Sequence, residues 1–419
     1  MNTLRHIKNL FKNNFFINFI NYYSFTLINL IIGFYSISYL SKIISPEDYG
    51  MLGIFGSILF FVPTIISFSA NGLQSVEIVT KSKKDYILFR NTLFSFLLCS
   101  SMVFFIIAIV SCFYFSDYVF IIITAFFMGF AIVCTSIHNT ELIQNAKATQ
   151  FGFLSTVTLL VSFTLTVIFL SLFNLDWKYR IISLLFAEYI YIIIRFSLIS
   201  DIWKNFHFHY DINSFKIFIK YGSPLMVSAF AGFIMHNSDR YFNLTYFGLK
   251  EVGLYTAAAG IASVIFTINS NLIKVFYPYV FELLSNRRGK VKIMKIILFY
   301  SLLILIIAGL FSLVINNFGH LFLGEKYLSS LNVIYLLCFS NAFFGIYSVS
   351  CLLIDYFKLT KVKTVIVVSS CSILILCNYL LIPIVGFLGP ALSILISFIV
   401  MSGSTFFYSL KLFKENNII

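Results

Sequence analysis

The sequence is poor in charged residues and lacks the motif of nucleotide-driven proteins. Only 11% of its 419 residues are Asp, Glu, Lys or Arg, whereas a soluble domain carries roughly 25%. Hydrophobic residues make up 60% of the chain, and the mean hydropathy is +0.95. No GxxxxGK[ST] phosphate-binding loop is present, because Gly289-Lys290 is followed by Val291. The composition therefore predicts a polytopic membrane protein that does not hydrolyse nucleotides.

Cysteine pairs and metal-ligand clusters are also missing from the sequence. The seven cysteines lie within apolar runs, none forms a CxxC pair, and their number is odd. His207 and His209, with Asp211 nearby, lie in a linker without further ligands. We therefore expect no disulfide, no metal site and no cofactor.

The basic residues report on membrane topology. The net charge is +13, but the lysines and arginines lie in short loops between apolar runs, so we expect no nucleic-acid partner. With the N-terminus inside, the inner segments hold 21 of the 29, Arg90 among them, and the outer segments hold 6. The remaining two, Arg195 and Lys274, lie within apolar runs. This bias predicts that both termini are cytoplasmic.

The apolar runs predict the fold class. A bilayer core needs about 20 apolar residues per helix. Twelve runs meet this length: 16–40, 50–70, 91–114, 118–140, 151–173, 180–200, 222–246, 251–277, 296–315, 331–354, 364–384 and 388–409. The first run is too long for a signal-peptide core and is expected to remain as a membrane helix. The sequence therefore predicts an all-α integral membrane protein with twelve transmembrane helices.

The two halves of the chain repeat one pattern. The segment 45–52, which contains Gly50, follows the first run, and the segment 248–255, which contains Gly253, follows the seventh at an offset of 203 residues. Six runs in each half, both starting inside, predict parallel repeats with the substrate site between them. We expect an N-terminal lobe at 1–200, a C-terminal lobe at 222–419, and a cytoplasmic amphipathic linker helix at 201–221.

The stretch 221–255 places an acid and a base inside an apolar helix. Asp239 and Arg240 follow two polar residues, Asn237 and Ser238. Charges in a membrane helix are costly unless they are partnered or face water. Two interpretations stay open: these residues line a water-filled cavity, or they form a pair at the outer membrane face.

Three more ionisable residues lie within predicted helices. Arg195 and Lys274 lie near the inner ends of theirs, where they either line a basic cavity or extend their side chains to the lipid headgroups. Glu188 precedes Arg195 by seven residues, so both lie on one helix face. Glu188 either contributes to a substrate site or forms an internal ion pair, with Arg195 or with a neighbouring helix, and the ion pair is the favoured interpretation.

Two histidines within apolar runs are candidates for coupling transport to protons. His138 and His236 would titrate near neutral pH if they kept an ordinary pKa. The alternative for both is a packing role with a satisfied hydrogen bond.

Five motifs at helix boundaries resemble a known family. They are Pro46-Glu47-Asp48-Tyr49-Gly50, Tyr221-Gly222-Ser223-Pro224-Leu225, Asn237-Ser238-Asp239-Arg240-Tyr241 followed by Val252-Gly253-Leu254-Tyr255, Gly324-Glu325-Lys326-Tyr327, and Asn378-Tyr379-Leu380-Leu381-Ile382-Pro383. In this order the chain resembles the O-antigen or capsule repeat-unit flippases of the multidrug/oligosaccharidyl-lipid/polysaccharide exporter superfamily. The resemblance covers essentially the whole chain.

The resemblance implies a structure and a function. It implies two six-helix lobes that form a V-shaped central cavity in the bacterial inner membrane. The implied substrate is an oligosaccharide repeat unit on undecaprenyl pyrophosphate, moved from the inner to the outer leaflet. A polysaccharide polymerase and a chain-length regulator are implied as possible partners, besides membrane lipids. Asp239 and Arg240 are the motif pair, while the first two helices lack any cation between Lys12 and Lys42.

Other classes of protein were weighed against the flippase. A drug/cation antiporter of the same superfamily would use a carboxylate or His138 for coupling, but acidic residues are scarce in the first four runs. A polymerase would need a large outer loop, whereas the longest predicted outer loop, around 316–330, has about 15 residues. A membrane scaffold would leave the charges within the sixth to eighth runs unexplained. We therefore expect a transporter and not an enzyme.

Overall fold

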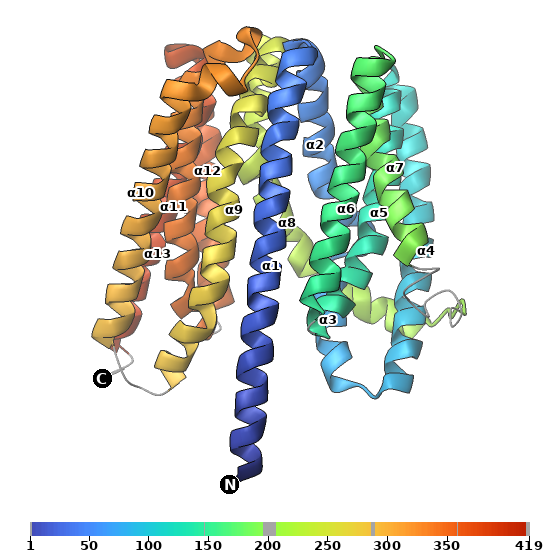
Figure 1. The fold of residues 1–419 in the computed structure, drawn as a ribbon, viewed down its shortest axis with the longest axis vertical. Helices are drawn as coiled ribbons and strands as arrows, with labels where there is room; N and C mark the ends of the chain where they lie inside the picture. Colours follow the sequence, from blue (N-terminus) through green and yellow to red (C-terminus); the bar gives the residue numbers. More distant parts are fainter. Residues whose placement is uncertain (1, 146, 196–206, 286–289, 358, 416–419) are drawn as a thin grey trace. The chain divides into compact units, whose positions relative to one another are not determined.

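The computed structural model describes residues 2–145, 147–195, 207–285, 290–357 and 359–415, and every helix or helical turn assigned there is shown in Figure 1. The α-helices are α1 (Asn2–Ile43), α2 (Pro46–Ser67), α3 (Asn71–Thr80), α4 (Lys83–Tyr114), α5 (Val119–Gln144), α6 (Ala148–Val167), α7 (Lys178–Ile194), α8 (Ile212–Phe247), α9 (Leu249–Ser285), α10 (Lys290–Phe322), α11 (Leu331–Tyr356), α12 (Thr360–Val385) and α13 (Gly389–Glu415). Short helical turns extend or join them at Ser116–Tyr118, Ile168–Leu172, Glu325–Ser330 and Gly386–Leu388.

The prediction of an all-α membrane protein is confirmed. Each of the twelve apolar runs coincides over most of its length with one long helix of the described chain, and α3 is a short addition between α2 and α4. Residues 196–200 of the sixth run lie outside the described residues. Ten described helical segments are long and apolar enough to cross a membrane, and one of these, Thr360–Leu412, contains both α12 and α13. The helix α7, with 17 described residues, is slightly shorter than these ten segments. The ten long apolar segments show that the chain is a multi-pass membrane protein.

Several helices begin earlier than their apolar runs. The helix α4 starts at Lys83, because Ser82 caps it by accepting a hydrogen bond from the Asp85 backbone N–H. Arg90, which the charge count assigned to a loop, therefore lies inside a helix. The helix α8 starts at Ile212, before Gly222 and Pro224. Residues 201–206 of the predicted linker lie outside the described residues, and its end, from Ile212 onward, is part of α8.

The chain forms two compact units, which we describe separately. Unit 1 contains residues 1–33 and 55–230, and unit 2 contains residues 34–54 and 231–419. The division therefore crosses α1, α2 and α8 within the helices and does not follow the sequence boundaries at 200 and 222. The predicted lobes, and the V-shaped cavity between them, stay predictions.

Unit 1 is built around α5, which packs against α3, α4, α6 and α7. The first turns of α8 belong to this unit because Phe218 is buried against the rings of Phe89 and Phe96, at centroid distances of 5.7 and 5.2 Å. A Cβ on Gly222 would overlap the carbonyl oxygen of Phe68, so glycine lets α8 approach the end of α2 closely.

Unit 2 is built around α11, which packs against α9, α10 and α13, while α12 packs on α13. Figure 1 shows these helices in yellow, orange and red. The end of α1 belongs to this unit because Ser38 Oγ donates to the Phe322 carbonyl (2.6 Å) and Tyr327 donates to the Ile44 carbonyl (3.1 Å). The Gly324–Tyr327 motif thus attaches the end of α1 to α10 and α11.

Candidate functional site

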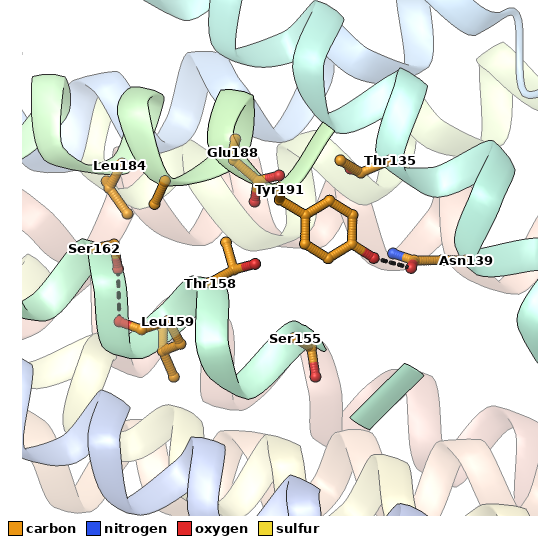
Figure 2. Close-up of a pocket in the computed structure, with 10 residues that line it drawn as sticks. Thr135, Asn139, Ser155, Thr158, Leu159, Ser162, Leu184, Glu188 and Tyr191 are labelled. Carbon is orange, nitrogen blue, oxygen red and sulfur yellow. Dashed lines mark hydrogen bonds between the residues drawn. The ribbon is translucent and has the colours of Figure 1, made fainter. Parts of the chain in front are cut away.

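A polar pocket lies between α5, α6 and α7 of unit 1 (Figure 2). Its volume is about 170 Å³. The lining residues are Thr135, Asn139, Ser155, Thr158, Leu159, Ser162, Leu184, Ala187, Glu188 and Tyr191. Seven of these ten are polar, although the three helices are mainly apolar. Polar and charged groups within membrane-spanning helices are expensive, so we take the pocket as a candidate functional site.

Tyr191 links this pocket to a buried arginine. Its hydroxyl donates to Asn139 Oδ1 (2.6 Å) and accepts from Arg195 Nη2 (3.1 Å). Arg195 has no exposed surface, and its guanidinium carbon lies 5.1 Å from the centroid of the Tyr191 ring. Its Nε and Nη1 have no acceptor among the described residues. The guanidinium therefore keeps hydrogen-bond donors for a further group.

The expected ion pair between Glu188 and Arg195 is not formed. Neither side chain takes part in a salt bridge among the described residues. Seven residues of helix correspond to a rise of about 10 Å, and Tyr191 lies between the two side chains and takes the guanidinium contact. This interpretation of Glu188 was wrong because sharing a helix face does not bring groups two turns apart into contact. Glu188 lines the pocket instead.

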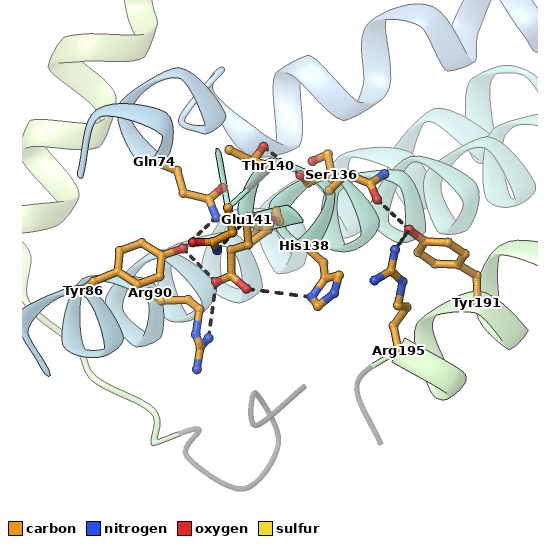
Figure 3. A network of polar contacts seen from close by, with 12 residues as sticks. Gln74, Tyr86, Arg90, Ser136, His138, Thr140, Glu141, Tyr191 and Arg195 are labelled. Carbon is orange, nitrogen blue, oxygen red and sulfur yellow. Dashed lines mark hydrogen bonds and ion pairs between the residues drawn. The ribbon is translucent and has the colours of Figure 1, made fainter. Parts of the chain in front are cut away.

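A second polar network lies at the ends of α4 and α5 (Figure 3). Glu141 accepts hydrogen bonds from Tyr86 (2.7 Å) and from Arg90 Nη1 (3.3 Å). Gln74 Nε2 donates to Tyr86 (3.0 Å) and to the Ile137 carbonyl (2.9 Å). The side chains of Arg90 and Glu141 are only 9% and 13% exposed, so they form a largely buried ion pair between α4 and α5. The hydrogen bonds of Gln74 connect α3 to the same network.

The two networks meet at His138. Its Nδ1 lies 3.9 Å from Glu141 Oε2, and the next residue, Asn139, belongs to the Tyr191 network. Arg90, Lys147 and Arg195, which we call the basic cluster, all lie within electrostatic range of the His138 ring. Glu141 supplies one negative charge against these three positive charges. The arrangement is chemically suited to hold an anion.

The motif pair of the sequence lies on α8 in unit 2. Arg240 Nη1 donates to Asn237 Oδ1 (2.7 Å), one turn earlier, while Asp239 is 3% exposed and accepts from the Arg240 backbone N–H (2.9 Å). Neighbouring helix residues differ in direction by about 100°, so the two side chains diverge. Tyr255 of α9, fully buried, lies beside the Asp239 carboxylate.

The two other predicted residues of unit 2 have different environments. His236 lies among Phe266, Phe344 and Phe398, with ring centroids 5.9, 5.4 and 5.8 Å away. Lys274 is exposed on α9 and donates to Asn271 Oδ1 (3.4 Å). The role of His236 in proton coupling and the role of Lys274 in substrate binding stay predictions.

Sequence analysis missed several residues of the unit 1 site. Arg90 was assigned to a loop, and Gln74, Tyr86, Asn139, Glu141 and Tyr191 were not singled out. One signal was present: Arg90 and Glu141 are opposite charges that border consecutive apolar runs at the same predicted membrane face. Among the described residues, no group of three or more His, Cys, Asp or Glu side chains is arranged to hold a metal ion. All seven cysteines are free thiols.

The fold is shared with known membrane transporters. A multidrug resistance MATE family transporter of the MOP superfamily, in an inward-facing conformation, aligns with a TM-score of 0.70 and 13% identity over 93% of this chain and 94% of that one. The lipid II flippase MurJ, in an inward closed conformation, also aligns with a TM-score of 0.70, at 15% identity over 93% of this chain and 87% of that one. The class is therefore a multi-pass helical membrane protein with the fold of these transporters.

The chain belongs to the family described as polysaccharide biosynthesis protein, whose family model matches residues 16–284. Two relatives come from Haemophilus influenzae. One is an uncharacterized membrane protein, 24% identical over 316 residues, which cover 70% of this chain and 73% of the relative. The other is Lsg locus putative protein 1, 23% identical over 312 residues, which cover 71% of this chain and 75% of the relative.

Proposed function

We propose that this protein is a flippase that moves an oligosaccharide repeat unit, linked to undecaprenyl pyrophosphate, from the inner to the outer leaflet of the bacterial inner membrane. Membership of the polysaccharide biosynthesis family supports this proposal, and so does the fold shared with a lipid II flippase. The observation that carries it is the basic cluster of unit 1, in which the buried Arg195 keeps two guanidinium nitrogens without an acceptor among the described residues.

The chemistry of the basic cluster fits a diphosphate. Guanidinium groups bind phosphate oxygens through charge-assisted hydrogen bonds, often two at a time. Arg195 offers Nε and Nη1, and Arg90 offers Nε, which also has no acceptor among the described residues. The positive-inside bias assigns this end of unit 1 to the cytoplasmic face, where the lipid-linked substrate would be collected. The cations that the first two helices lack would be supplied by Arg90 of α4 and by Arg195, which directly follows α7.

The lipid chain and the sugars of the substrate need fewer specific contacts with the protein than the pyrophosphate does. The undecaprenyl chain can stay in the lipid, and the sugars need a polar path. In unit 2, Arg240 and Asp239 stay candidates for contacts with the substrate, as does Lys274. We expect a multi-pass inner-membrane protein with both termini in the cytoplasm, which works beside a polysaccharide polymerase and a chain-length regulator and catalyses no covalent step.

The proposal is tested in a deletion strain. We expect loss of the surface polysaccharide, with complete lipid-linked repeat units retained on the inner leaflet of membrane vesicles. Wild-type protein and Lys178→Ala should restore transport, because Lys178 lies at the opposite end of α7 and is paired with Asp176 at the surface. Arg195→Ala should reduce it about ten- to a hundredfold, the effect of losing hydrogen bonds from a charged group.

Other outcomes would point to other functions. If single repeat units reach the surface but the chains do not lengthen, the protein acts as a polymerase. If the surface is unchanged and the strain becomes drug-sensitive, the protein is a drug/cation antiporter. The antiporter is the second candidate because the Glu188 pocket offers a carboxylate to a cationic compound.

A further inference from the structure

An apolar groove, which we call the aromatic groove, lies between α4, α5 and α7 of unit 1. Its volume is about 270 Å³. Five of its seven lining residues are phenylalanine or methionine: Met102 and Phe105 of α4, and Phe126, Phe127 and Phe130 of α5. The other two, a serine of α4 and a tyrosine of α7, donate their hydroxyl hydrogens to helix carbonyls, at 2.8 and 3.3 Å. The aromatic groove therefore offers a hydrocarbon surface to its ligand.

The rings of the aromatic groove support one another. The ring centroid of Phe105 lies 5.0 Å from that of Phe126 and 5.9 Å from that of Phe127, and the last two are 5.5 Å apart. Aromatic pairs attract each other at these distances. Phe126 is buried in the core of unit 1, whereas Phe127 and Met102 are exposed at the rim. The groove is therefore preformed, with one open side that a flexible methionine borders.

The aromatic groove lies near the middle of the membrane. Two of its lining residues, Ser101 on α4 and Phe130 on α5, are each 11 residues from a member of the buried ion pair, Arg90 and Glu141 respectively. Eleven residues of helix rise about 16 Å and return to nearly the same face. Both helices thus place the groove on the side of the ion pair. Because the hydrocarbon core is about 30 Å thick and the pair lies toward its inner edge, the groove is about halfway across, where lipid chains reach it.

The aromatic groove and the basic cluster suit two parts of one molecule. The basic cluster fits a diphosphate, and a lipid chain attached to that diphosphate has to pass the depth of the groove. A cavity of ~150 Å³ holds one benzene ring, so 270 Å³ has room for roughly ten carbons, or two isoprene units. The double bond of each isoprene unit cannot rotate, so ordering a polyprenyl chain costs less entropy per carbon than ordering a saturated acyl chain.

We propose that the aromatic groove binds the polyprenyl chain of the lipid-linked substrate, at the isoprene units that lie near the middle of the membrane. This inference rests on the proposed function, because it takes the undecaprenyl lipid as the ligand. The groove then recognises the lipid carrier, whichever sugars the carrier bears. A lipid that bears no sugar can therefore test the groove without transport, so the two proposals can fail separately.

The test uses the purified full-length protein in phosphatidylcholine nanodiscs. The probe is a polyprenyl monophosphate with a photoreactive group in the middle of its chain. After illumination, mass spectrometry should find the probe attached near Met102 on α4 and near Phe127 on α5. An excess of undecaprenyl phosphate should displace the probe. An equal excess of phosphatidylglycerol, which also has an anionic headgroup but carries acyl chains, should not.

Two variants change the groove without adding a polar group. Met102→Trp places a large ring at the open rim and should reduce labelling about tenfold, the effect of keeping roughly two CH₂ groups of the ligand out of contact. Val110→Trp is the matched control, because it adds the same ring at an exposed position of α4 outside the groove. Phe127→Leu removes a ring from the rim and should also weaken labelling. All three variants should unfold at temperatures close to that of the wild type.

The proposal is overturned if phosphatidylglycerol displaces the probe as well as undecaprenyl phosphate does, because the groove then accepts any lipid chain. It is also overturned if Met102→Trp and Phe127→Leu are labelled like the wild type. If the groove is labelled as expected but the deletion strain still exports its repeat units, the flippase proposal fails and the polyprenyl site stands. If repeat units accumulate inside the strain but the groove is not labelled, only the polyprenyl site fails.

Discussion

Gly50 and Gly253 pack against each other at equivalent positions of the internal repeat. A Cβ on Gly50 would overlap the carbonyl oxygen of Leu249, and a Cβ on Gly253 would overlap that of Pro46. The offset of 203 residues relates Gly50 to Gly253 and also Pro46 to Leu249. The starts of α2 and α9 therefore meet reciprocally within unit 2, and glycine permits the close approach of the two backbones.

This contact predicts a steric effect of side chains there. Gly253→Ala should destabilise the protein by about 1–3 kcal/mol, the range for overpacking a close contact, because the obstacle is a backbone carbonyl that cannot rotate away. Gly309→Ala on α10 is the matched control, since a Cβ there meets nothing within 4 Å. It should be neutral or stabilise by up to ~1 kcal/mol. Thermal unfolding in detergent measures both, and equal effects would contradict the steric explanation.

The Arg90–Glu141 ion pair is predicted to stabilise unit 1. Glu141→Ala should cost about 3–5 kcal/mol, because it leaves the largely buried guanidinium of Arg90 without its carboxylate. Glu77→Ala, which removes the more exposed pair with Lys81, should cost only about 0.3–0.5 kcal/mol. Denaturant unfolding of the two variants compares them. If Glu141→Ala lowers the free energy of unfolding as little as Glu77→Ala does, the buried pair is not needed for stability.

Tyr191 is predicted to position Arg195 of the basic cluster, and this prediction rests on the proposed function. Tyr191→Phe keeps the ring but removes the hydroxyl between Asn139 and Arg195. We expect substrate transport to fall by up to about tenfold, because the Arg195 guanidinium loses the acceptor that orients it. Tyr189→Phe, whose hydroxyl contacts the Phe127 carbonyl on an exposed face, should behave like the wild type. Unchanged transport in Tyr191→Phe would show that this hydroxyl does not position Arg195.

The start of α8 is predicted to respond to pH through Asp211. Hydrogen bonds from the Ser214 side chain and then from the Asn213 backbone hold the pKa of Asp211 below its usual value. A carboxyl with a lowered pKa stabilises the folded state above its unfolded pKa, and this contribution is lost as the pH falls through the lowered value.

Hydrogen exchange of residues 212–216 measures this effect. In the wild type, exchange should quicken at acidic pH. Asp211→Asn keeps a capping side chain and should remove the pH dependence, whereas Asp211→Ala should quicken exchange at every pH. Exchange in the wild type that does not change with pH would show that Asp211 does not cap the helix.

The fold was predictable because its main signal is local in the sequence. A run of about 20 apolar residues forms a membrane helix whatever its partners are, so the twelve runs were found. The helix starts were not: Arg90 was placed in a loop because the hydropathy signal ends where the lipid core ends, whereas α4 continues to its cap at Ser82. The internal repeat could also be recognised from the sequence, since Gly50 and Gly253 occupy matching positions in segments 45–52 and 248–255.

The site was only partly predictable because its contacts join distant residues. The sequence by itself marked Glu188 and Arg195 as unusual, since a charge in an apolar run stands out without knowledge of any partner. Only the tertiary structure decided that these two do not pair, that Tyr191 lies between them, and that Arg90 meets Glu141 across 51 positions of sequence. Hydrogen-bond geometry extends over about 3 Å, and which side chains come that close is set by the packing of α4, α5 and α7.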